Sequence, residues 1–139
     1  MTSQSDDYYL NKIGQIAIDE ALCYEKILIY AEVEDATIEV SFFFKDPVGK
    51  IIYKFASEKL EDSIYKFWKY WQTIPGNREW RCFIYAIDDG KFTLDLKYPD
   101  QIDDTKTSFS RRPSVILEHF GDAEIDYSNP EDGWALGLK

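Results

Sequence analysis

The sequence has little of what most metal and redox sites are built from. Its 139 residues include one histidine, His119, and two cysteines, Cys23 and Cys82, which are far apart and flanked by apolar residues. Zinc sites need clustered cysteine and histidine ligands, and this spacing supplies no such cluster. We therefore expect reduced and buried cysteines, an ordinary packing or surface role for His119, and no metal or cofactor.

Glycine is also scarce, with seven residues that lie mostly at turns. We find no phosphate-binding loop, dinucleotide fingerprint or nucleophile elbow. The aspartates near residues 88 and 100 do not have the spacing of an EF-hand. General acid–base chemistry usually recruits histidine or a carboxylate in a cleft, and no such pairing is visible. The sequence therefore predicts a protein that is not an enzyme.

Long apolar runs and positive charge are missing too. No run approaches the roughly 20 apolar residues that a membrane span needs. The start, MTSQSDDYYL, lacks the basic and apolar parts of a signal peptide, so we expect a cytoplasmic protein without membrane contact. With 26 acidic and 16 basic residues, the net charge is −10. Such a surface repels nucleic acid and attracts basic proteins, while the simpler interpretation is that its acidity keeps the protein soluble.

The content of hydrophobic residues is sufficient for one packed domain. Hydrophobic residues make up 45% of the chain and aromatic residues 17%, which excludes global disorder. We expect residues 1–139 to form a single domain. The tail, 122–139, shows no clear period, although Trp134 and Leu136 could dock on the rest.

The period of the apolar residues predicts the elements. A helical period appears at 57–74, at 8–22 and at 110–121, the last beginning near Pro113. Alternation predicts strands at 25–33, 36–44, 50–55, 79–87 and 91–98. Asp89-Gly90 is a strong hairpin signal, because both central residues of such a turn take a positive φ. The expected fold is α+β, with one antiparallel five-stranded sheet, helices covering one face of it, and the order α-β-β-β-α-β-β-α.

Carboxylates stand at both ends of one predicted strand, in the stretch AIDDGKFTLDLKYPDQIDD at 86–104. Nothing in the sequence supplies a catalytic partner for them. We interpret them as contacts for a basic protein partner, with a neighbouring tyrosine as an aromatic contact, while solvated loop acids are the alternative. The predicted partner-binding residues are Asp88, Asp89, Tyr98, Asp100, Asp103 and Asp104.

Arg111 and Arg112 form the chain's only arginine pair, just before the third predicted helix. Guanidinium groups bind carboxylates through paired hydrogen bonds. Because the acidic loop 99–107 immediately precedes this pair, we expect the arginines to clamp carboxylates of the chain itself.

An ordered set of motifs resembles a known family. YEKILIYAEV at 24–33, then EWRCFIYAIDDGKFTLDLKYPDQIDD at 79–104 and SRRPSVILEHFG at 110–121 resemble the YezG-like family of bacterial immunity proteins. The sequence departs from that pattern at Tyr24, where the family has tryptophan, at Pro99, and at Phe120, where it has leucine. The matching residues are Trp80, Gly90, Lys91, Phe92, Tyr98, Asp100, Arg111, Arg112 and Gly121.

The resemblance implies a non-enzymatic antitoxin that blocks the toxin domain of a secreted or contact-dependent toxin, often a nuclease. The acids would then face the toxin's basic groove in place of phosphates, or bind away from the active site. A monomer is favoured over a dimer. The alternative is an acidic secretion chaperone of the type III class, which the order of elements also resembles; such a chaperone dimerises and wraps an unfolded effector segment around its apolar patches.

Overall fold

The structure is a computed structural model that describes residues 4–21, 24–34, 37–102, 105, 108–121 and 125–127. Its helices are α1 (Gln4–Ala21), α2 (Glu58–Gln72), a short 3-10 turn η1 (Pro99–Gln101) and α3 (Ser108–Phe120). Its strands are β1 (Lys26–Glu34), β2 (Thr37–Lys45), β3 (Ile51–Phe55), β4 (Cys82–Asp88), β5 (Lys91–Lys97) and β6 (Ile125–Asp126).

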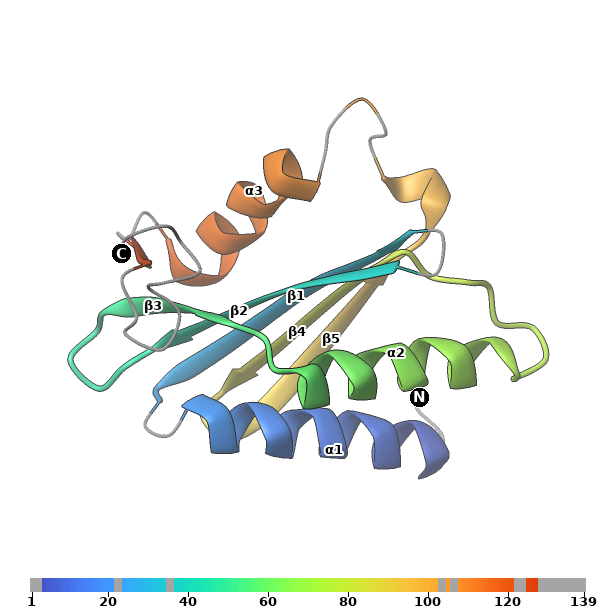
Figure 1. The fold of residues 1–139 in the computed structure, drawn as a ribbon, viewed down its shortest axis with the longest axis horizontal. Helices are drawn as coiled ribbons and strands as arrows, with labels where there is room; N and C mark the ends of the chain where they lie inside the picture. Colours follow the sequence, from blue (N-terminus) through green and yellow to red (C-terminus); the bar gives the residue numbers. More distant parts are fainter. Residues whose placement is uncertain are drawn as a thin grey trace.

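One sheet joins all these strands in the order β5-β4-β1-β2-β3-β6 (Figure 1). The neighbours from β5 to β3 are antiparallel, as expected, whereas β6 pairs in parallel with β3 through Ile125 and Asp126. The α+β class is confirmed, but the prediction of five antiparallel strands is wrong, because the described sheet is six-stranded and mixed. The missed strand has two residues, too few for a period of two to appear in the sequence.

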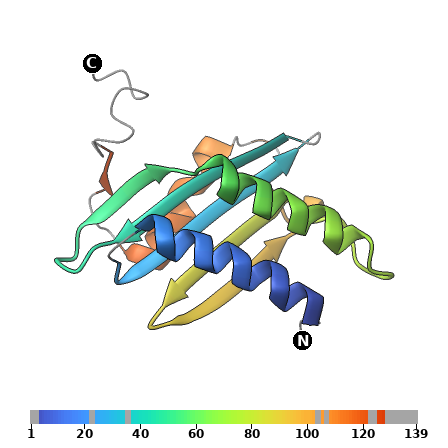
Figure 2. The same cartoon turned by 60° about the horizontal axis from the view of Figure 1, so that its bottom comes forward.

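Helices cover both faces of the sheet, and not one face as expected. Figures 1 and 2 show α1 and α2 side by side on one face, with α3 on the other. Alternate strand residues face the two sides. The larger core, under α1 and α2, includes Ile29, Phe42 and Phe83, and the smaller core, under α3, includes Leu28 and Phe43. Strands buried on both faces therefore need apolar residues at successive positions.

Local signals explain where α2 and the β4–β5 hairpin begin and end. Ser57 is the N-cap of α2, and its Oγ accepts a hydrogen bond from the Leu60 N–H at 3.1 Å. Asp89 and Gly90 both have positive φ, 55° and 74°, as the hairpin signal predicts. By contrast, α3 begins before its predicted start, so that Pro113 lies inside the helix. None of the helices in the described residues is long and apolar enough to cross a membrane.

Candidate functional site

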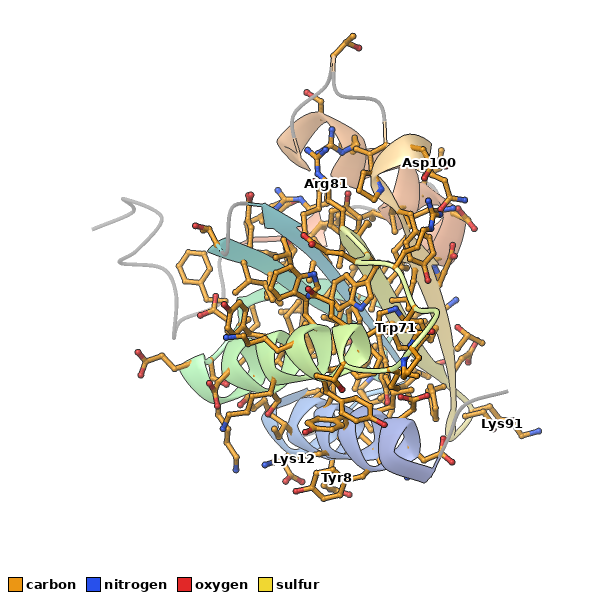
Figure 3. The ribbon with its side chains drawn as sticks, turned by 90° about the vertical axis from the view of Figure 1, so that its right-hand side faces the viewer. Tyr8, Lys12, Trp71, Arg81, Lys91 and Asp100 are labelled. Atoms are coloured by element: carbon orange, nitrogen blue, oxygen red, sulfur yellow. The ribbon has the colours of Figure 1, made fainter. Side chains whose placement is uncertain are left out.

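The β4–β5 hairpin places the predicted partner-binding residues at two separate positions. Asp88 and Asp89 lie at its turn, while Tyr98 and Asp100 follow the far end of β5. Because β5 has seven residues at about 3.4 Å each, the two positions are about 20 Å apart. Figure 3 shows this separation, with Lys91, beside the turn, and Asp100 at opposite ends of the strand. Asp103 and Asp104 lie outside the described residues.

A hollow of about 350 Å³ lies at the turn end of the hairpin. It is formed where the ends of β2 and β4, the start of β1 and the last turn of α3 meet. The hollow is therefore assembled from distant parts of the chain, and two of the predicted carboxylates belong to it. Its lining residues are Glu25, Lys26, Lys45, Asp88, Asp89, His119 and Phe120.

Lys26 contacts three of the other residues that line this hollow. Its Nζ donates to the His119 carbonyl at 2.6 Å, at the C-terminal end of α3, where the helix dipole favours a positive charge. The same Nζ is 3.8 Å from Asp88 Oδ2 and 5.8 Å from the centre of the Phe120 ring. The Asp88 side chain is 66% exposed, so most of its carboxylate surface still faces solvent. Burial, and then the nearby Lys26 charge, lower the pKa of His119, which favours its neutral form.

The far end of the hairpin is a second, more compact cluster. Arg78 lies over the Tyr98 ring at 4.4 Å and donates to Asp100 Oδ1 at 3.3 Å. The Tyr98 N–H donates to Gln101 Oε1 at 2.9 Å, which fixes the first turn after the strand. The carboxylate of Asp100 is 68% exposed and Arg78 is 61% exposed. An ion pair this exposed is weak, so a partner's basic group can compete for Asp100.

The arginine pair binds the chain itself, as expected, and its contacts reach beyond the preceding loop to strands of the sheet. Arg111 Nε donates to Glu32 Oε2 at 3.0 Å, and its Nη2 also donates to Glu32 Oε1. Arg112 Nη1 donates to Ser41 Oγ at 2.8 Å. The partners are on β1 and β2 because α3 lies across the back of the sheet. Glu32 lies on the back face of β1, in the same alternation as Leu28 and Tyr30. In the sequence, a carboxylate among alternating apolar residues predicts that a cation lies beside it in the folded protein.

Two chemically distinctive side chains join this back-face network. Tyr30 Oη donates to Glu32 Oε2, and burial, followed by this hydrogen bond, raises the pKa of Tyr30. Cys82 is a free, buried cysteine, as predicted, and burial raises the pKa of its thiol to about 12. A thiol held protonated in this way is a poor nucleophile. Cys23 lies outside the described residues.

The described residues contain no group of three or more histidine, cysteine, aspartate or glutamate side chains placed to hold a metal ion. No family model matches the chain, and no curated protein matches it either. The resemblance to YezG-like immunity proteins therefore stays a prediction. What the geometry offers is exposed carboxylates at the two ends of one hairpin, with Asp88 and Asp89 at its turn and Asp100 just after β5.

Proposed function

We propose that the protein is an immunity protein that binds a basic toxin domain in a stoichiometric complex and so neutralises it. The observation that carries the proposal is the exposure of carboxylates at both ends of one hairpin. Asp88 and Asp100 are about two-thirds exposed although each has a basic neighbour. β4 pairs with β1 and β5 pairs with β4, so the acids at the turn belong to a strand pair that is already part of the sheet, which lowers the ordering cost of binding.

A nuclease is the toxin class that best fits this surface. A nuclease groove is basic because it must hold phosphates, and carboxylates can occupy the same positions. A net charge of −10 also accelerates the encounter with a basic partner. Rapid capture is useful for an inhibitor, since toxin that stays free cleaves its substrate.

The proposal is tested with the product of the adjacent gene, co-expressed and purified with the chain. We expect a stable complex and protection of toxin-expressing cells. Association rates at several ionic strengths are then compared for Asp88→Asn/Asp89→Asn and for Asp100→Asn/Asp103→Asn/Asp104→Asn. We expect slower association and a flatter salt dependence for these variants, because fewer opposite charges attract each other.

A matched control removes exposed acids elsewhere. Asp7 and Asp19 lie on α1, and neither lines the hairpin hollow. Asp7→Asn/Asp19→Asn removes the same charge as Asp88→Asn/Asp89→Asn. If both double variants have the same rates and salt slopes, the hairpin acids are only part of the general surface charge. If no folded basic partner binds, the immunity function is wrong.

A second candidate is the secretion chaperone of the type III class. It is favoured by one observation, the element order from α1 to α3, which is the order expected for that class. This is an analogy of fold, and it carries less weight than a site. The two functions differ in the state of the partner, which remains folded with an immunity protein and is extended with a chaperone. A two-dimensional NMR spectrum of the labelled partner in the complex distinguishes them, and a dimeric chain favours the chaperone.

A further inference from the structure

The strand β2 continues past the end of β3 and leaves part of the sheet edge open. β3 pairs with β2 only from Lys45 to Ser41, and the chain then leaves the sheet towards Ser57, the N-cap of α2. Residues 37–40 of β2 pair with β1 on one side. On the other side, the described part of the chain provides no strand.

The main chain of Ile38 faces this open side. The Val33 N–H donates to the Arg81 carbonyl at 2.9 Å, which directs Val33 towards β4 and away from β2. Ile38 is the direct partner of Val33 in the β1–β2 register. Opposed residues in an antiparallel pair direct their main-chain groups either towards each other or away from each other. The N–H and C=O of Ile38 therefore point away from β1, and such groups are a template for an added strand.

An open hollow of about 570 Å³ lies against this edge. Its apolar surface comes from the half-buried Ile38 and Tyr65, and the Tyr65 ring is stacked on Trp68 with 5.6 Å between ring centres. The hollow thus combines an apolar surface with a strand edge that pairs with no other strand in the described residues. Its lining residues are Ile38, Glu58, Lys59, Glu61, Asp62 and Tyr65.

The rim of the hollow has an excess of negative charge. Asp62 is neutralised by Lys66 at 2.8 Å, which leaves Glu58 and Glu61 facing one basic residue, Lys59. Burial, and then the charge of Glu58, raise the pKa of Glu61, so that a positive group placed here would favour its charged form. The charge complementary to this rim is a Lys or Arg side chain.

We propose that this open edge of β2 is a docking site for an extended basic peptide segment. The segment's main chain hydrogen-bonds to Ile38 as an added strand, one of its apolar side chains packs on Ile38 and Tyr65, and a Lys or Arg reaches Glu58 and Glu61. The site is separate from the hairpin hollow and does not require the partner to be a toxin. The opposite sheet edge, β5, instead carries Lys91, Asp95 and Lys97, charges of the kind that keep an edge from pairing.

The test uses a displayed library of ten-residue peptides in which Lys or Arg alternates with Val, Ile, Leu or Tyr. A matched library carries Asp or Glu in place of the basic residues. We expect the full-length protein to select peptides from the basic library alone. With the strongest binder synthesised, NMR shift changes are expected at 37–40 and 58–65. Amide exchange at Ile38 should slow by about tenfold or more on binding, because a new hydrogen bond protects its N–H.

Two variants test the two kinds of contact. Glu58→Gln/Glu61→Gln should weaken binding about tenfold and flatten its salt dependence. Ile38→Pro removes the outward N–H while leaving the ladder with β1, since proline is tolerated where the N–H of an edge strand faces outwards. Asp95→Asn/Glu118→Gln, on β5 and α3, removes the same charge away from the hollow and is the control for loss of charge. Circular dichroism checks that each variant is folded.

Several outcomes would overturn the proposal. It fails if no basic peptide is selected, or if the selected peptide binds the Glu58→Gln/Glu61→Gln variant as tightly as the parent. NMR shift changes along β5, with none along β2, would also overturn the proposal, because they would place the peptide at the other edge of the sheet. Strong protection of the Ile38 N–H in the free protein would mean that the chain itself already occupies the edge.

Discussion

Arg111 on α3 and Glu32 on β1 form a buried, two-point ion pair across the back of the sheet. The Glu32 side chain is 6% exposed and that of Arg111 is 13% exposed, so water solvates neither group well. Tyr30 donates a further hydrogen bond to the same carboxylate. The hydrogen bond to Glu32 raises the pKa of Arg111, which keeps the guanidinium charged.

We predict that Arg111→Met destabilises the protein by about 3 kcal/mol, because it leaves a buried carboxylate without its cation. Urea unfolding at pH 7 measures the loss. The control is Arg78→Met, which removes the exposed pair with Asp100 and should cost less than about 1 kcal/mol. Equal losses for the two variants would contradict a structural role for the buried pair.

Gly14, in the middle of α1, is required by a close contact with Tyr85. A Cβ at position 14 would lie 2.5 Å from the Tyr85 Oη, which donates to the Leu10 carbonyl at 2.9 Å. The Tyr85 ring cannot easily move, since it is stacked between Phe83 and Phe92 with 5.7 and 5.2 Å between ring centres. Gly14→Ala should therefore destabilise the protein by about 1–3 kcal/mol, although alanine favours a helix by about 1 kcal/mol.

A second substitution separates this contact from other causes. Tyr85→Phe removes the hydroxyl that the new methyl group would meet, so Gly14→Ala should cost much less in the Tyr85→Phe background than in the parent. Thermal or urea unfolding of the four proteins gives this coupling. Additive losses would show that the hydroxyl is not what excludes a side chain at position 14.

Stability should fall in alkaline solution. Burial raises the pKa of the Cys82 thiol from 9.0 to about 12, and it also raises the pKa values of Tyr30 and Tyr85 above 10.0. The folded state therefore keeps protons that the unfolded chain releases. The free energy of unfolding should change little between pH 7 and 8. Above that range it should fall, approaching about 1.4 kcal/mol per pH unit for each group that is deprotonated in the unfolded chain and still protonated in the folded protein.

The measurement is urea unfolding between pH 7 and 11. Cys82→Ala should flatten the profile between pH 9 and 10, where the thiol is the first of these groups to titrate in the unfolded chain. Tyr8→Phe is the control, because the Tyr8 side chain is 61% exposed. An unchanged slope for Cys82→Ala would contradict the buried, protonated thiol.

Much of the fold was predictable because its information is local. Ser57 and the apolar period that follows it predicted α2, and Asp89-Gly90 predicted the hairpin that carries the acids. By contrast, nothing local shows that α3 covers the opposite face. A weaker signal was present in FFF at 42–44 and in FIYAI at 83–87, where successive apolar residues leave no side of the strand for solvent.

The candidate site was predictable only in part. The wide separation of Asp88 from Asp100 could be predicted from the strand length, since most of the residues between them form one extended strand. The cations beside them could not be predicted: Lys26 reaches Asp88 from the start of β1, and Arg78 reaches Asp100 from the segment before β4. Such pairs depend on the order of strands in the sheet, which the apolar period does not specify.

The position of α3 also sets the order in which the protein can be completed on the ribosome. In the described residues, the core beneath α1 and α2 is formed by the chain up to Tyr98. The back of the sheet, with Leu28, Tyr30 and Phe43, is covered only when residues 108–120 have been synthesised. Until then, a nascent chain with a nearly finished sheet presents a hydrophobic face that also holds the carboxylate of Glu32. Because Arg111 lies on α3, it reaches that carboxylate at the same step that covers the face, and we expect α3 to dock late in biosynthesis.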